Sequence, residues 1–155
     1  MTLADLQNRL RDLVAAEPLL AGRPVLIEDK QNLISAIETA LAETSLCVVI
    51  APVSGQAKVS TQPQASSVLP RRAAVGEILE ISLFRGLIDA ADVPSTVAVL
   101  DALRARLHGA PLTADQSYRG TFAFVSHNLR DQEDGTYVRV LTFAATVTIS
   151  PPAGV

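Results

Sequence analysis

The sequence predicts an α+β domain, in which helices pack on a mixed, largely antiparallel β-sheet. In the first half of the chain, segments with helical periodicity alternate with short apolar runs that are typical of strands. In the last third, two strand patterns flank a strong turn signal, which predicts an antiparallel pair. A mixed sheet with helices packed on it accommodates both features.

Length and composition set the first limits. The chain has 155 residues, which predicts one domain over residues 1–155. Its mean hydropathy of +0.29 indicates that some apolar surface is covered by partner subunits. The net charge of −3 disfavours a general nucleic-acid binder. Cys47 is the single cysteine, so a reducing compartment is expected, and the sequence has no long apolar run that predicts a membrane span.

The chain begins with a predicted helix over residues 2–16. Leucines recur on one face of this segment, and Thr2 followed by Asp5 is a variant of the capping box. Pro18 closes the helix, because proline cannot continue it. The apolar residues 25–27 then predict a short strand.

A second helix is expected over residues 29–43. Its apolar side chains recur with helical spacing at Leu33, Ile34, Ile37 and Leu41. Residues 46–51 are apolar on both faces and β-branched in the middle, which predicts a buried central strand. Pro52 is expected to end that strand or to move it to an edge.

Residues 53–74 have no periodicity and form a predicted long polar arm. The only charges in it are positive, at Lys58, Arg71 and Arg72. Long polar stretches inside a domain are usually functional or disordered. Two interpretations stay open: a loose loop, or an extended arm that becomes ordered against a partner. In the second, Arg71 and Arg72 would contact an acidic surface, such as the 131–134 tip of a neighbouring subunit.

A strand is predicted over residues 77–85 and a third helix from residue 95 to His108. The strand alternates, with Leu79, Ile81 and Leu83 on one face. The helix has Val97, Leu100, Leu103 and Leu107 on its predicted apolar face. Gly109 is a suitable C-terminal cap.

The last third predicts a C-terminal β-hairpin. Residues 118–125 and 136–149 are its two strands, and residues 128–135 are its polar, acidic tip with a turn at Asp134-Gly135. In the second strand the apolar side chains alternate with threonines. Those expected on the apolar face are Leu141, Phe143, Ala145, Val147 and Ile149.

The sequence contains no recognised catalytic, metal or phosphate motif, so no catalytic, metal-binding or cofactor-binding residue is predicted. Cys47 lies in an apolar strand, which predicts a structural role. His108 and His127 have no ligand partner at a recognised spacing, and we expect them to be solvated or to act as caps. The acidic tip lacks the spacing of a calcium loop.

The element order and the closing segment FAFVSHNLRDQEDGTYVRVLTFAATVTI resemble the tail terminator (tail completion, minor tail) proteins of long-tailed bacteriophages and related gene transfer agents. Members of that family begin with a helix and place an apolar strand like LCVVIAP before a loop. A strand like EILEISLF and a helix like PSTVAVLDALRARL follow, and an acidic hairpin with a Thr-rich strand ends the chain. The likeness covers nearly the whole sequence. The chain departs from the pattern by an extra N-terminal helix before the strand at residues 25–27 and by the unusual length of residues 53–74.

The resemblance implies a structural virion protein, not an enzyme, that binds no cofactor. Its copies would form a homo-hexameric ring that caps the tail tube, stops tube polymerisation and joins the tube to the head–tail connector or stopper protein. DNA would pass through the lumen only as cargo, and a negative net charge suits such a channel because like charges repel. The ring would be assembled in the host bacterial cytoplasm, would reside in the tail–neck region of the virion, and would have no membrane partner.

The surface residues expected at the subunit, tube or connector interface come from the arm and the hairpin tip: Lys58, Gln62, Gln64, Arg71, Arg72, Arg130, Asp131, Glu133 and Asp134. Other interpretations stay open. The chain could be a head–tail connector or stopper neck protein, a small motif-free α+β enzyme or ligand-binding domain, or a ring subunit of a bacterial regulatory or secretion system.

Overall fold

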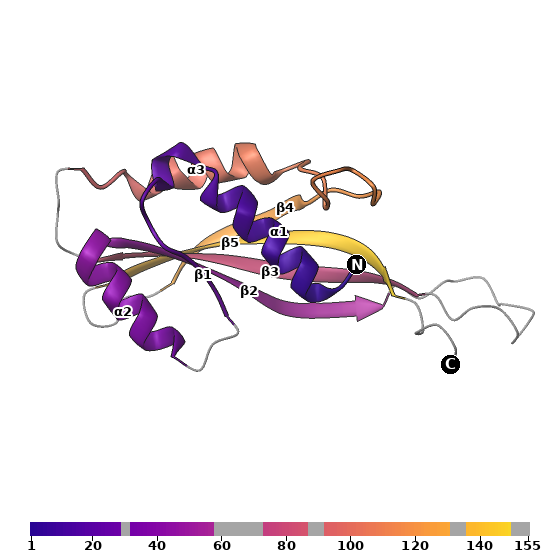
Figure 1. Ribbon diagram of the computed structural model, residues 1–155, viewed down its shortest axis with the longest axis horizontal. Helices are drawn as coiled ribbons and strands as arrows, with labels where there is room; N and C mark the ends of the chain where they lie inside the picture. Colours follow the sequence, from indigo (N-terminus) through magenta and orange to yellow (C-terminus); the bar gives the residue numbers. More distant parts are fainter. Residues whose placement is uncertain (29–31, 58–72, 87–91, 131–135, 150–155) are drawn as a thin grey trace, which may run out of the picture.

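The computed structural model describes residues 1–28, 32–57, 73–86, 92–130 and 136–149. Helices and strands are interspersed along the chain, and a pair of strands ends the described part (Figure 1). In chain order the elements are α1 (Leu3–Ala15), the 3₁₀ helix η1 (Pro18–Leu20), β1 (Val25–Ile27), α2 (Leu33–Thr44), β2 (Leu46–Ala57), β3 (Ala73–Gly86), α3 (Thr96–Leu107), β4 (Ala123–Arg130) and β5 (Thr136–Ile149).

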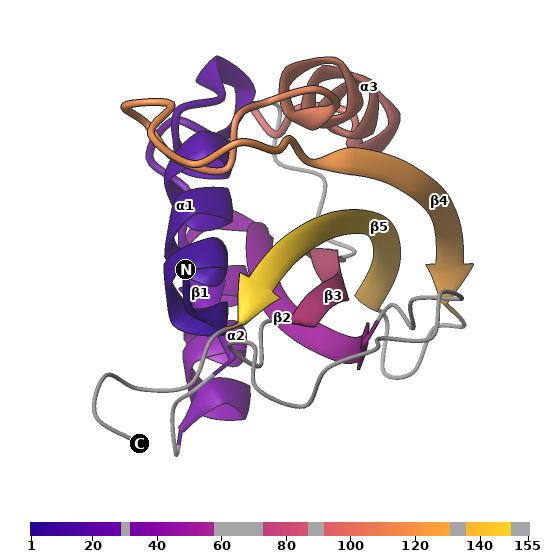
Figure 2. The same cartoon turned by 90° about the vertical axis from the view of Figure 1, so that its right-hand side faces the viewer.

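The strands form one five-stranded sheet in the order β1-β2-β3-β5-β4. β1 is parallel to β2, and all other neighbours are antiparallel. This arrangement confirms the predicted α+β fold with a mixed, largely antiparallel sheet. The pairing of β4 with β5, in which Arg130 lies opposite Val138, confirms the predicted C-terminal hairpin. The sheet curls strongly, so that β4 turns toward α3 (Figure 2).

The larger core lies between the sheet and the pair α1 and α3. The alternating apolar side chains of β3 and β5 face it, and Phe122 and Phe143 are its largest buried side chains. α1 begins at the predicted capping box, in which Asp5 N donates to Thr2 Oγ1. The buried Gln7 side chain fixes α1 to β2, because its Nε2 donates to the Ile50 carbonyl oxygen at 3.0 Å.

The opposite face of the sheet is covered by α2. A smaller core there joins α2 to β2 and β3, with Cys47 and Val49 buried in it. Burial raises the pKa of the Cys47 thiol to about 11, in keeping with the structural role predicted for it. Ser45 links α2 directly to β2 and adopts the left-handed conformation at φ 59°. Its carbonyl accepts from Gly86 N, which ties the junction to β3.

Two predicted helix faces were partly wrong. α2 begins at Leu33, later than predicted, although residues 29–31 lie outside the described part of the chain. Ile34 was expected on the apolar face of α2 but is 75 % exposed. In α3, Val97 is 52 % exposed, and Val99 occupies the buried position instead. The remaining members of the predicted α3 face, Leu100, Leu103 and Leu107, are buried.

Pro52 does not end β2, but it lies at an edge of the sheet, which was the second alternative predicted for it. Among the described residues β1 pairs with β2 only as far as Ile50, and beyond that point β2 pairs with β3 alone. The strand continues to Ala57, and its register shifts between Pro52 and Ser54, which is how a β-bulge accommodates a residue without an N–H. β3 likewise begins at Ala73, so the two ends of the predicted 53–74 arm belong to strands. The middle of that arm, residues 58–72, lies outside the described residues.

The first strand of the hairpin lies about five residues later than predicted. Residues 118–122 form an irregular segment whose Phe122 bonds to the chain after α3, with Phe122 N donating to the Ala110 carbonyl. Residues 128–130, expected in the turn, belong to β4. β5 matches its prediction at both ends, although Ile149 is exposed instead of lying on the apolar face.

Candidate assembly surfaces

The interface residues predicted from the sequence are mostly not described by the structure. Arg130 is the one that it describes, and it lies at the end of β4. The others lie outside the described residues: Lys58, Gln62, Gln64, Arg71, Arg72, Asp131, Glu133 and Asp134. Their predicted role in contacts therefore stays a proposal.

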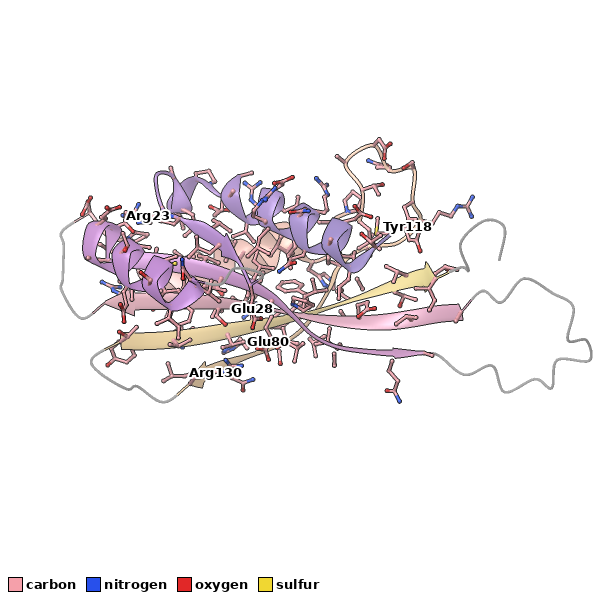
Figure 3. All side chains as sticks on the ribbon, turned by 60° about the horizontal axis from the view of Figure 1, so that its bottom comes forward. Arg23, Glu28, Glu80, Tyr118 and Arg130 are labelled. Carbon is pink, nitrogen blue, oxygen red and sulfur yellow. The ribbon has the colours of Figure 1, made fainter. Side chains whose placement is uncertain are left out.

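Arg130 is held on the sheet by an ion pair. Its Nη2 lies 2.7 Å from Oε2 of Glu80, a residue of β3, so the side chain crosses over β5 (Figure 3). Arg130 is exposed, and Glu80 is more buried than Arg130. An exposed ion pair contributes little stability but fixes the direction of a charge. Arg130 thus presents a positioned cation on the face that α2 also occupies.

A row of small and polar side chains crosses that same face beyond α2. Glu80 pairs with Ala51 on one side and with Thr142 on the other, and Thr142 pairs with Ser126. These side chains are partly accessible to solvent. A half-polar sheet face without a large apolar patch is typical of a surface that meets solvent or a wet interface.

A groove of about 380 Å³ lies between α3 and β4, on the side of the molecule away from α2. Its lining residues are Asp101, Arg104, Ala105, His108 and Phe124. The Arg104 guanidinium lies over the Phe124 ring at 5.1 Å from its centroid, a cation–π arrangement that orients the charge. Arg104 Nη1 is also 3.7 Å from Asp101 Oδ1.

The floor of the groove is formed by Phe124, which is held by a ring contact and a backbone hydrogen bond. Phe124 packs edge-to-face on the buried Phe143 with ring centroids 5.7 Å apart. Phe124 N donates to His108 Nδ1 at 3.1 Å. Because Nδ1 accepts this bond, neutral His108 carries its proton on Nε2, where it is available to an acceptor. His108 was expected to be solvated or to act as a cap; its side chain is exposed and accepts from the backbone N–H of Phe124. The groove therefore offers two oriented donors beside an aromatic ring.

The groove was not predicted from the sequence. The predicted third helix contains Arg104 and ends at His108, but no binding role was assigned to either residue. The signal was present in their spacing, since residues 101, 104, 105 and 108 fall on one face of a helix. Phe124 lies in the strand predicted at residues 118–125, but the sequence does not show that this strand packs beside the third helix.

A second hollow of about 240 Å³ lies where η1 meets the C-terminal end of α2. Arg23 lies in it and donates from Nη2 to the Asp92 carbonyl at 3.0 Å, while its buried Nε has no partner among the described residues. The lining is largely polar and includes Glu43. The Arg23 side chain therefore joins the chain after η1 to the chain before α3.

Tyr118 covers the sheet edge next to the start of β4. Its hydroxyl accepts from Thr148 N at 2.6 Å, which satisfies a backbone donor of β5 beyond the last pair with β4 (Figure 3).

The outer edge of β4 from Val125 to Arg130 is paired with no strand in the described part of the chain. Val125 and Leu129 are exposed along it. Open edges of this kind can accept a partner.

Within the described ranges, no cluster of three or more His, Cys, Asp or Glu side chains is placed to hold a metal ion. The same residues include no helix long and apolar enough to span a bilayer.

Comparisons with known proteins place the fold. No family model matches the chain, and no curated protein matches its sequence. Among solved structures, the chain is similar to a chain in the structure of the virion of a native gene transfer agent particle. The TM-score is 0.51 at 18 % sequence identity, and the match covers 94 % of this chain and 93 % of that chain. At this identity the likeness shows a shared fold from end to end.

Proposed function

We propose that this protein is a structural component of a phage-like virion and acts through its surfaces, not as an enzyme. The observation that carries the proposal is the end-to-end likeness of its fold to a chain of a gene transfer agent virion. The match covers 94 % of this chain and 93 % of that chain, so the likeness extends over nearly all of residues 1–155. On this proposal residues 1–155 act as one domain.

The finer proposal is that the chain is a tail terminator. Copies would form a closed ring, hexameric in the family that the sequence resembles, on the end of the tail tube. The ring would stop tube polymerisation and present its other side to the head–tail connector or stopper, with DNA passing through the lumen. Two differently built exposed surfaces, the α3–β4 groove and the face that carries Arg130, support it, because a ring needs two complementary faces on each copy.

Electron microscopy of the purified protein tests the ring directly. We expect negatively stained particles with a central hole, and light scattering that gives a multiple of the 16.4 kDa chain mass. Particles from a producer strain that lacks this chain should carry tubes of uncontrolled length and no attached heads. Tubes of normal length joined to heads in that strain would refute the terminator role. Tubes of normal length that carry no heads would instead favour a connector or stopper.

A further inference from the structure

We propose that neighbouring copies of this chain contact each other through α2 of one copy and the α3–β4 groove of the next. The inference rests on the proposed ring and names the residues that close it. In this contact Ile34 lies against Ala105 and Phe124, and the Glu38 carboxylate accepts from Arg104 and His108.

α2 has the chemistry of a docking helix. Ile34 is 75 % exposed, the largest exposed fraction among the large hydrophobic side chains that the structure describes. Glu38 follows one turn later on the same side, about 40° around the helix axis. The twelve residues of α2 carry two glutamates and no basic residue. Neither Glu38 nor Glu43 forms an ion pair within the described ranges, so both are free to meet a partner.

The groove is complementary to this helix in shape and charge. Ala105 is small and leaves space beside the Phe124 ring, in a hollow of about 380 Å³ that can take a branched aliphatic side chain. Arg104 and the His108 Nε2 proton lie at its polar side. The ion pair between Asp101 Oδ1 and Arg104 Nη1 is long, at 3.7 Å. The other guanidinium N–H groups of Arg104 can therefore donate to a carboxylate of the neighbouring copy.

The positions of the two surfaces determine the symmetry. α2 lies on one face of the sheet and α3 on the other (Figure 2). An acidic helix that docks in a cationic groove forms a head-to-tail contact, in which each copy uses α2 toward one neighbour and its groove toward the other. Contacts of this type generate rings when the rotation closes. A two-fold dimer built on α2 alone would bring like charges together.

Charge reversal tests the contact with two variants of the full chain. Glu38→Arg places an arginine opposite Arg104, and Arg104→Glu places a glutamate opposite Glu38. We expect each change to raise the dissociation constant of the contact on the order of a hundredfold and to leave monomers in light scattering. Glu43→Arg is the matched control, because Glu43 lies about 180° around α2 from Ile34 and should leave the ring intact. Circular dichroism of each variant verifies that it is folded.

Mixing the two defective variants gives the decisive measurement. In an alternating ring, Arg at position 38 of one variant meets Glu at position 104 of the other, and the remaining contacts have the wild-type charges. An equimolar mixture should therefore recover rings that neither variant forms alone. If both variants form rings as the wild type does, or if the mixture stays monomeric, the α2–groove contact is wrong although the ring stands. If both variants form rings but these rings no longer bind tail tubes, the groove contacts the tube protein and not a second copy of this chain. A wild-type protein that never assembles would overturn the proposed ring and this contact together.

Discussion

Replacing Arg106 by glutamine tests the ion pair that joins α3 to the turn after α1. Arg106 Nε lies 2.9 Å from Glu17 Oε2, and the Glu17 side chain is only 9 % exposed. Two unit charges about 4 Å apart attract by about 4 kcal/mol at an effective dielectric constant of about 20. The Arg106 side chain is 35 % exposed, and solvent screening lowers the expected loss of unfolding free energy to about 2 kcal/mol. For a domain of this size, this corresponds to a fall in Tm of about 4–8 °C.

Thermal unfolding at neutral pH, followed by circular dichroism, measures this loss. Arg11→Gln is the control, because its partner Asp12 is well exposed, and we expect a change of at most about 0.5 kcal/mol. The double variant Glu17→Gln, Arg106→Gln should recover much of the stability, since it leaves no charge buried without a partner. The reasoning is refuted if Arg106→Gln costs no more than the control, or if the double variant is less stable than Arg106→Gln.

Three further outcomes are expected. Thr2→Ala should lower the free energy of unfolding by about 1 kcal/mol in urea titrations, because it removes the α1 cap. The Thr2 backbone N–H holds the pKa of the Asp5 carboxyl below its usual value, so the wild-type contribution should be present at neutral pH and lost as pH falls through that lowered pKa. Burial raises the pKa of the Cys47 thiol to about 11, so the thiol should resist a disulfide reagent at pH 8 until the protein is unfolded. The contribution of the protonated thiol to the free energy of unfolding should be complete below pH 9 and should be lost as pH rises toward 11. Leu103→Ala should cost about 2–5 kcal/mol in the same titrations, because this side chain is fully buried, and a smaller loss would show that the core collapses around the cavity.

The fold class could be predicted because most elements carry a clear period. In β3 and β5 apolar side chains alternate with polar ones and one face of each strand is buried, which predicts a strand. In α1 the apolar side chains lie on one face, which predicts a helix. β4 had no such signal, because an edge strand with both faces partly exposed does not alternate in sequence. Phe122 and Phe124 suggested a strand over residues 118–125, but they lie on either side of Ala123, where the irregular segment ends and β4 begins.

The candidate surfaces were harder to predict for the same reason. Ile34 fits the apolar period of α2, and only the packing of that helix on β2 and β3 shows that its side chain is exposed. Val97 and Val99 lie about 200° apart around the axis of α3, so only one of them can face the core. Both are valines, and their type therefore does not show which one is buried. The α3–β4 groove depends on two elements distant in sequence. Its residues therefore become a group only when the strand register is known.

The junction at Ser45 has a mechanical consequence. α2 passes into β2 through this one left-handed residue, and the Gly86 N–H braces it from the neighbouring strand. With no linker between them, we expect a displacement of α2 to be transmitted to β2. β2 is twelve residues long, and a straight strand of that length reaches about 40 Å. Because β2 is paired with β3 along this whole length, we expect a displacement of α2 to be shared by both strands as far as Ala57.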